Sequence, residues 1–193
     1  MLSARERILE VAFRLFYANG IRAVGVDTVI AESGVAKATL YKHFASKDEL
    51  VLAYLEKADR AWREKLEAAA DDAGEDPRAQ LVGLFDAVVS TCRSQSYHGC
   101  PFINTAAEAV QGSAAHARTI EHKRAVRAWI RSLAQSAGAR DPDALALSLT
   151  LLLDGALAAG VLDADPGVAA SAKDAARRLV DDSLSHSREE TNA

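Results

Sequence analysis

Residues 34–50, GVAKATLYKHFASKDEL, bring several side chains that can bind phosphate into one short stretch of chain. Lysine, threonine, tyrosine and histidine all donate hydrogen bonds, and the lysines also carry positive charge. Read as a helix over about 37–43, the stretch places Leu40 and Phe44 four residues apart on one face, where both can reach a core. The opposite face then carries polar side chains and the small Ala38, which lets a backbone approach closely.

A second helix is expected just before this one, opened by Asp27 as its cap and ended by Gly34. Two short helices joined by a tight turn form a helix-turn-helix, whose second helix enters the major groove of DNA. Lysines there suit phosphates and guanine edges, and threonine suits phosphate or a thymine methyl group. We therefore predict DNA contacts from Lys37, Ala38, Thr39, Tyr41, Lys42, His43 and Lys47.

The residues that follow the helix over 37–43 strengthen the prediction of DNA binding. Ser46 and Glu49 form an S-x-x-E capping box, which predicts that another helix begins beside Lys47. The N-terminus of such a helix offers free N–H groups and a positive dipole to phosphate. A polar helix face is often only solvated, but here the helix-turn-helix layout, the split between faces and the capped next helix occur together.

The net charge of the chain is weaker evidence about DNA binding than these motifs are. The 193 residues carry 23 Lys+Arg and 27 Asp+Glu, a formal charge of −4, so the chain is not a bulk polycation for nucleic acid. Residues 1–57 hold 8 basic and 7 acidic side chains, whereas residues 58–193 hold 15 and 20. Any affinity for DNA must therefore come from individually placed side chains near the N-terminus.

The rest of the chain reads as helices. Apolar residues recur with helical spacing throughout, and glycines and prolines separate about nine segments, the later ones over about 77–95, 101–111, 115–137, 142–160 and 167–186. We expect an all-α fold with a helix-turn-helix domain over residues 1–50 and a second helical domain over 51–193. The most apolar stretch, 145–162, is long enough to cross a membrane, but Asp154 and Gly155 interrupt it and favour a buried interface helix.

The N-terminal motifs are also distinctive as a pattern. F-x₃-G at 16–20 and VDTVIAESGVAKATLYKHFASKDEL at 26–50 resemble the DNA-binding segment of the TetR family of bacterial transcriptional regulators. Ala36 and Ala38 depart from the Ser and Gly that many members carry, so the cap of the recognition helix should be weaker. The resemblance implies a cytoplasmic homodimer that binds a pseudo-palindromic operator, most simply as a repressor, and that a small-molecule effector releases.

The same resemblance implies that the last two helices pair across a two-fold axis and that the middle helices enclose an effector pocket. For the dimer interface we predict Leu145, Leu149, Leu152, Ala156, Ala172, Ala176 and Leu179. For the pocket we predict Phe85, Val89, Cys100, Phe102, Asn104, Trp129 and Leu153, although isolated apolar residues of this kind are more often ordinary core. Glu108, four residues after Asn104, either turns toward the ligand, caps a helix or faces solvent.

Other functions find less support in the sequence. Cys92, Cys100, His98 and His116 show no C-x-x-C or H-x₃-H spacing, so we expect no metal site and no cofactor; Cys100 is either simply buried or redox-sensitive. An all-α enzyme would need a convergent acid–base set, but the candidate side chains, Asp86, Glu108, His116, Glu121 and His122, are scattered. A ligand-independent architectural DNA-binding protein would not need the helices over 77–137.

Overall fold

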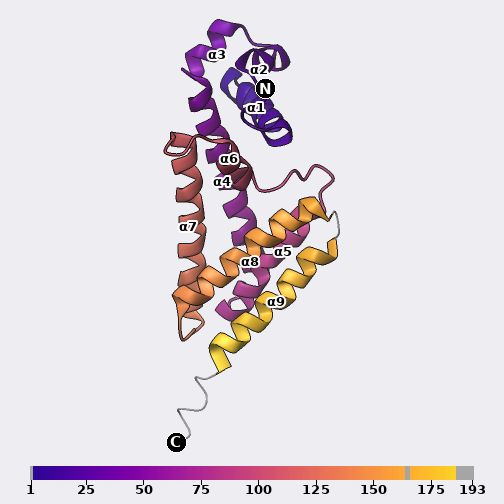
Figure 1. Cartoon of the computed structure of the whole chain (residues 1–193), viewed down its shortest axis with the longest axis vertical. Coiled ribbons are helices and arrows are strands. Elements are labelled where there is room, and N and C mark those ends of the chain that lie inside the picture. Colours follow the sequence, from indigo (N-terminus) through magenta and orange to yellow (C-terminus); the bar gives the residue numbers. More distant parts are fainter. Residues whose placement is uncertain (1, 164–165, 186–193) are drawn as a thin grey trace, which may run out of the picture. The chain divides into compact units, whose positions relative to one another are not determined.

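The computed structural model describes residues 2–163 and 166–185, and every regular element in these ranges is a helix (Figure 1). The predicted all-α class is therefore confirmed. The helices are α1 (Ala4–Asn19), α2 (Val26–Ser33), α3 (Lys37–His43), α4 (Lys47–Asp72), α5 (Pro77–Cys92), α6 (Pro101–Glu108), α7 (Ala114–Ser136), α8 (Pro142–Leu162) and α9 (Pro166–Leu184).

The helices pack as two compact units. Unit 1 consists of residues 1–61 and 101–122, and unit 2 consists of residues 62–100 and 123–193. The long helices α4 and α7 each contribute residues to both units. The predicted division at residue 50 falls inside α4, so it remains a prediction about where DNA binding resides and not a boundary between packing units.

Unit 1 begins with an amphipathic helix held by a complete capping box. The Ser3 side chain accepts the Glu6 N–H at 3.2 Å, and the Glu6 carboxylate accepts the Ser3 N–H at 2.7 Å. Hydrogen bonds to the Glu6 carboxylate, first from the backbone N–H of Ser3 and then from its side chain, hold the pKa of Glu6 below its ordinary value. Their contribution to stability is therefore lost as the pH falls through that lowered pKa. The helix buries Ile8, Ala12, Leu15 and Phe16, and Gly20 follows its last residue with a φ of 85°.

The α2–α3 hairpin packs onto α1 through a few large side chains. Gly34 adopts a φ of 65°, a left-handed conformation that glycine tolerates, and so ends α2 where the sequence predicts. Leu40 and Phe44 are 0% and 1% exposed. The guanidinium of Arg5 lies over the Phe44 ring at 5.1 Å from its centroid, which ties the end of α3 to the start of α1.

The remainder of unit 1 is held by a buried cluster of charged and aromatic side chains. Asp59 of α4 accepts hydrogen bonds from Arg118 at 2.8 Å and shares one with Nδ1 of His122 at 2.5 Å. The ring of Phe102 stacks on the His122 imidazole with 3.5 Å between centroids and 4° between planes. Asp59 and His122 are 4% and 1% exposed, so this cluster fastens α6 and the start of α7 to α4.

Unit 2 is built around α5, α8 and α9. Gly83 of α5 permits a close approach, because a Cβ there would lie 2.6 Å from the Cβ of Ala73 and 2.8 Å from the Ala69 carbonyl oxygen. Gly160 of α8 likewise permits the close approach of Cys92. Burial raises the pKa of the Cys92 thiol. Lys123 pairs with Asp154, so the charged residue in the apolar stretch has a cationic partner.

Among the described residues, α8 is the one helix whose length and composition would allow it to cross a membrane. Buried helices of soluble proteins meet the same criterion, and α8 buries Leu145, Leu149 and Leu153 inside unit 2.

Replacing Asp59 with alanine should destabilise the protein by about 3–5 kcal/mol, because it removes the buried carboxylate shared by a half-buried arginine and a buried histidine. Chemical denaturation measures the free energy of unfolding. Glu121→Ala is the matched control, since Glu121 reaches the same Arg118 from an exposed position at 3.6 Å and should cost well under about 1 kcal/mol. Equal losses for the two variants would contradict a structural role for the cluster.

Candidate nucleic-acid interface

The short helix α3 presents one polar face to solvent. Lys37, Ala38, Tyr41 and Lys42 are exposed, while Thr39 and His43 are half-buried at its edges. Leu40 and Phe44 point into the core of unit 1, so the helix cannot rotate without exposing them. The division into a core face and a polar face is as predicted, and the contact of these residues with DNA remains a prediction.

The start of α3 lacks a side-chain cap. Ala36 occupies the N-cap position with an extended backbone, and only its carbonyl oxygen takes part, accepting the N–H groups of Thr39 at 2.8 Å and Leu40 at 3.2 Å. This agrees with the weak cap expected from alanine at this position. Core packing and not capping therefore holds the helix in place.

Asp27 does not cap α2, which corrects the expectation from sequence. The N-cap residue is Gly25, without a side-chain bond, and Asp27 lies in the first turn of the helix. Its carboxylate instead accepts a hydrogen bond from Nζ of Lys37 at 3.2 Å, where both side chains are more than half exposed. An exposed pair of this kind contributes little stability, so Lys37 is free to exchange its partner for a phosphate or a base.

The N-terminus of α4 lies next along the chain, and Ser46 opens it as the capping box predicts. The Ser46 hydroxyl accepts the Glu49 N–H at 3.1 Å, and the Glu49 carboxylate accepts the N–H of Ala45 at 2.6 Å. Lys47 is half-buried, and its ammonium group donates to the carbonyl oxygen of Arg22 at 3.4 Å. It is thus held near the turn between α1 and α2.

The predicted pocket residues lie in different packing units. Phe102 and Asn104 belong to unit 1, and Phe85, Val89, Cys100, Trp129 and Leu153 belong to unit 2. Phe85, Cys100, Phe102 and Leu153 are buried, whereas Val89, Asn104 and Trp129 are half-buried. An effector pocket formed by these residues remains a prediction.

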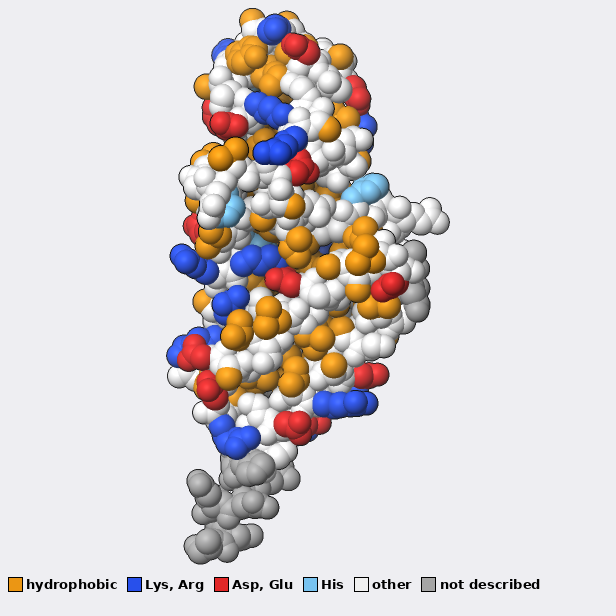
Figure 2. Space-filling model, in the orientation of Figure 1, with side chains coloured by type: hydrophobic (Ala, Val, Ile, Leu, Met, Phe, Trp, Pro, Cys, Tyr) orange, Lys and Arg blue, Asp and Glu red, His pale blue; other side chains and the backbone are white. Residues whose placement is uncertain are grey.

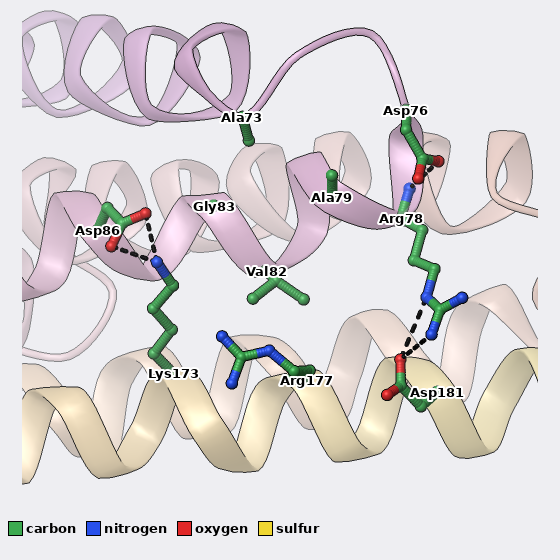
Figure 3. A pocket seen from close by; sticks show the side chains of 10 residues that line it. All are labelled: Ala73, Asp76, Arg78, Ala79, Val82, Gly83, Asp86, Lys173, Arg177 and Asp181. Carbon is green, nitrogen blue, oxygen red and sulfur yellow. Dashed lines mark hydrogen bonds and ion pairs between the residues drawn. The ribbon is translucent and has the colours of Figure 1, made fainter.

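Unit 2 contains a groove that the sequence does not indicate. It has a volume of about 470 Å³ and runs between α5 and α9 (Figure 3). Lys173 pairs with Asp86 at 2.5 and 2.6 Å, and Arg78 pairs with Asp181 at 2.7 Å. These partners are 87 and 103 residues apart, so no local spacing could have matched them. The groove shares no residue with the predicted pocket, and its ion pairs join the two helices.

The residues predicted for the dimer interface lie mostly inside the single chain, and their contact with a partner remains a prediction. Five of the seven side chains are at most 7% exposed: Leu145, Leu149, Ala156, Ala172 and Ala176. Leu152 is half-buried, and Leu179 is 37% exposed. Because α8 is apolar on nearly all sides, helical spacing could not separate its inner face from its outer face.

The outer face of α8 is itself apolar. We call it the α8 stripe, and it consists of the exposed residues Ala144, Leu147, Leu151, Gly155, Ala158 and Leu162. Leu151 and Leu162 are 62% and 82% exposed. Figure 2 shows hydrophobic side chains clustered in the lower half of the view, where Figure 1 places α8 and α9.

The side chains considered for acid–base chemistry have other partners. Asp86 pairs with Lys173, Glu108 accepts the N–H of Arg22, and His122 contacts Asp59. Within the part of the chain that the structure describes, no group of three or more His, Cys, Asp or Glu side chains is placed to hold a metal ion. Both cysteines are free thiols.

Comparison with known proteins identifies the family. Residues 8–54 match the model for "Bacterial regulatory proteins, tetR family". The chain is 34% identical to SCO4454, a TetR-family transcriptional regulator from Streptomyces coelicolor, with a TM-score of 0.88 over 94% of this chain and 90% of that one. A regulator of the same kind from Streptomyces avermitilis is 35% identical, with a TM-score of 0.77 over 91% of this chain and 98% of that one.

Curated relatives match over a shorter span. The regulator TcmR of Streptomyces glaucescens is 32% identical over 95 residues, which are 49% of this chain and 41% of that protein. The repressor KstR2 of Mycobacterium tuberculosis is 34% identical over 87 residues, which are 43% of this chain and 41% of that protein. The match therefore spans about two fifths of these relatives. Because the likeness to the two Streptomyces structures covers nearly the whole length of both partners, the chain belongs to the TetR family of bacterial transcriptional regulators.

Proposed function

We propose that the protein is a DNA-binding transcriptional repressor that binds a pseudo-palindromic operator as a homodimer. The observation that carries this proposal is the polar face of α3, held outward by the buried Leu40 and Phe44. A rigid helix that displays lysines and hydroxyl groups suits the major groove, where phosphate contacts fix position and base edges provide specificity. The relative KstR2 is named a repressor, whereas FasR of Mycolicibacterium smegmatis, 42% identical over 53 residues, is named an activator; repression is the mode proposed here.

The α8 stripe supports a homodimer with a second copy of the chain as its occupant. Its exposed leucines recur at helical spacing, and Leu179 of α9 provides a further exposed apolar side chain in the same unit. Two copies related by a two-fold axis would cover both stripes with identical contacts and present two recognition helices to an inverted repeat. An operator-binding role places the protein in the cytoplasm, where its two free thiols remain reduced.

We further propose that a small, largely apolar effector releases the protein from DNA. The chain devotes α5, α6 and α7 to more structure than DNA docking and pairing through α8 and α9 require. Phe85, Val89, Cys100, Phe102, Asn104, Trp129 and Leu153 remain the residues proposed to contact it. An architectural DNA-binding protein, the second candidate, would bind DNA equally well with or without any small molecule.

Side chains assigned to phosphate and to bases should respond differently to mutation. Lys47→Ala and Tyr41→Phe should weaken binding to all duplexes, and loss of Lys47 should reduce the slope of log affinity against log salt by about one unit. Lys37→Ala should cost about 1–3 kcal/mol, mainly on the operator, if it reads a base edge. Fluorescence anisotropy with operator and random duplexes over a range of salt measures both effects. Equal loss on both duplexes for Lys37→Ala would assign it to the backbone.

A charge in the α8 stripe should break the dimer. Leu151→Glu places a carboxylate at the centre of the proposed interface, where it would lie buried without a partner, so the variant should be monomeric at micromolar concentration. Sedimentation equilibrium gives the mass. The control is Val110→Glu, because Val110 is 68% exposed but belongs to unit 1 and not to the proposed interface. A dimeric Leu151→Glu variant would show that the pairing surface lies elsewhere.

An effector must obey reciprocity. A ligand that weakens operator binding by a coupling of about 1–3 kcal/mol, or about 5–150-fold, must bind more weakly by the same factor when operator is present. Calorimetric titration of candidate ligands with and without operator measures this coupling, and Phe102→Ala and Trp129→Ala should change it. A ligand that binds equally in both conditions is not the effector, and unchanged coupling in both variants would place the pocket elsewhere.

A further inference from the structure

The turn that joins α1 to α2, residues 20–25, is held by a side chain from a distant part of the sequence. Glu108, the last residue of α6, accepts the N–H of Arg22 at 2.7 Å through Oε2. The two residues are 86 positions apart and both belong to unit 1. The bond is charge-assisted, which makes it stronger than one between neutral groups.

The turn is shaped to admit this carboxylate. Gly20 has a φ of 85°, and a Cβ on it would lie only 2.9 Å from both Cδ and Oε2 of Glu108. Glycine thus suits this position in two ways: its backbone conformation favours glycine, and a Cβ would force the Glu108 carboxylate to shift. Ile21 and Val24, at 9% and 5% exposed, anchor the rest of the turn in the core.

Lys47 holds the same residue, Arg22, through its carbonyl group. The carbonyl oxygen of Arg22 accepts a hydrogen bond from the Lys47 ammonium group at 3.4 Å. The Arg22 residue therefore points its N–H toward an anion and its C=O toward a cation. Lys47 is the first residue of α4 and one of the side chains proposed to contact DNA, so this turn connects α6 with the proposed DNA-binding surface.

The position of Glu108 is fixed independently of the turn. Six residues before it, Phe102 stacks on His122, which contacts Asp59 of α4. The segment 101–122 is consequently fastened to α4 at one point and to the α1–α2 turn at another. A displacement of α6 relative to α4 would strain or break the Glu108 contact.

The geometry points to Glu108 as a positioning residue for DNA binding, which holds the α1–α2 turn, and through it Lys47 and the α2–α3 hairpin, in the conformation that fits the operator. This inference rests on the proposed function and assigns to Glu108 a role different from the ligand contact considered from sequence. The carboxylate already has a partner inside unit 1, the N–H of Arg22.

The contact is tested first by a double-mutant cycle on stability. Gly20→Ala should be more destabilising than Gly112→Ala, because Gly112 has a similar φ of 82° in the same unit but nothing within 4 Å of an added Cβ. Adding Glu108→Ala should recover part of the loss in Gly20→Ala and none in Gly112→Ala. Additive effects in the Gly20–Glu108 cycle would overturn the contact.

The role in positioning is tested by operator affinity. Glu108→Gln keeps the size of the side chain but removes its charge, and should weaken operator binding by about 10-fold, within the range of typical couplings. Glu108→Asp keeps the charge on a shorter side chain and should therefore lose less operator affinity than Glu108→Gln. The control is Val88→Ala in the core of unit 2, which lowers stability and leaves the residues of the turn unchanged. The losses of operator affinity in the two variants are compared under conditions where their free energies of unfolding are equal.

The outcomes separate this inference from the proposed function. If the unmodified chain binds no DNA, the proposed function fails, while the stability cycle still reports on the contact. If the unmodified chain binds operator and Glu108→Gln binds it equally well, the positioning role is overturned and the proposed function stands. A loss in Glu108→Gln no greater than in Val88→Ala at equal stability also overturns it.

Discussion

Burial of Leu40 and Phe44 is the constraint on which the rest of the proposed interface depends. A seven-residue helix without a side-chain cap is not stable alone in water, because the cost of nucleating it exceeds what so few hydrogen bonds return. Packing of these two side chains, at 0% and 1% exposed, supplies the missing stability. It also fixes rotation about the helix axis, so the polar side chains face outward together. The orientation needed to enter a groove is therefore set by the hydrophobic core beneath it.

Apolar side chains of α8 lie on two faces of the helix. Leu145, Leu149 and Leu153 of α8 fill the core of the single chain, while Leu147 and Leu151 remain outside it. A helix that is apolar on both sides is expected where one face packs within a protomer and the other is covered by a partner. Pairing through this outer face would hold the recognition helices of two copies at a fixed spacing. An effector would have to change that spacing to release the operator.

Local features of the sequence were sufficient to predict most of the fold. The α3 pattern, the stop at Gly34 and the Ser46–Glu49 cap each depend on residues a few positions apart, and the structure agrees with all three. The side of α8 that faces outward from the single chain could not be predicted, because α8 is apolar almost all round. The contacts of Glu108 with Arg22 and of Asp59 with His122 could not be predicted, because they join residues 86 and 63 positions apart through the tertiary fold.

The most direct test of the central claim is selection of bound sequences from a pool of random duplexes by the purified full chain. Because two recognition helices related by a two-fold axis each read one half-site, the account predicts enrichment of an inverted repeat, with half-site centres a whole number of helical turns apart. Footprinting should then protect both half-sites together. Enrichment of a single asymmetric site, or no enrichment over the starting pool, would contradict the account.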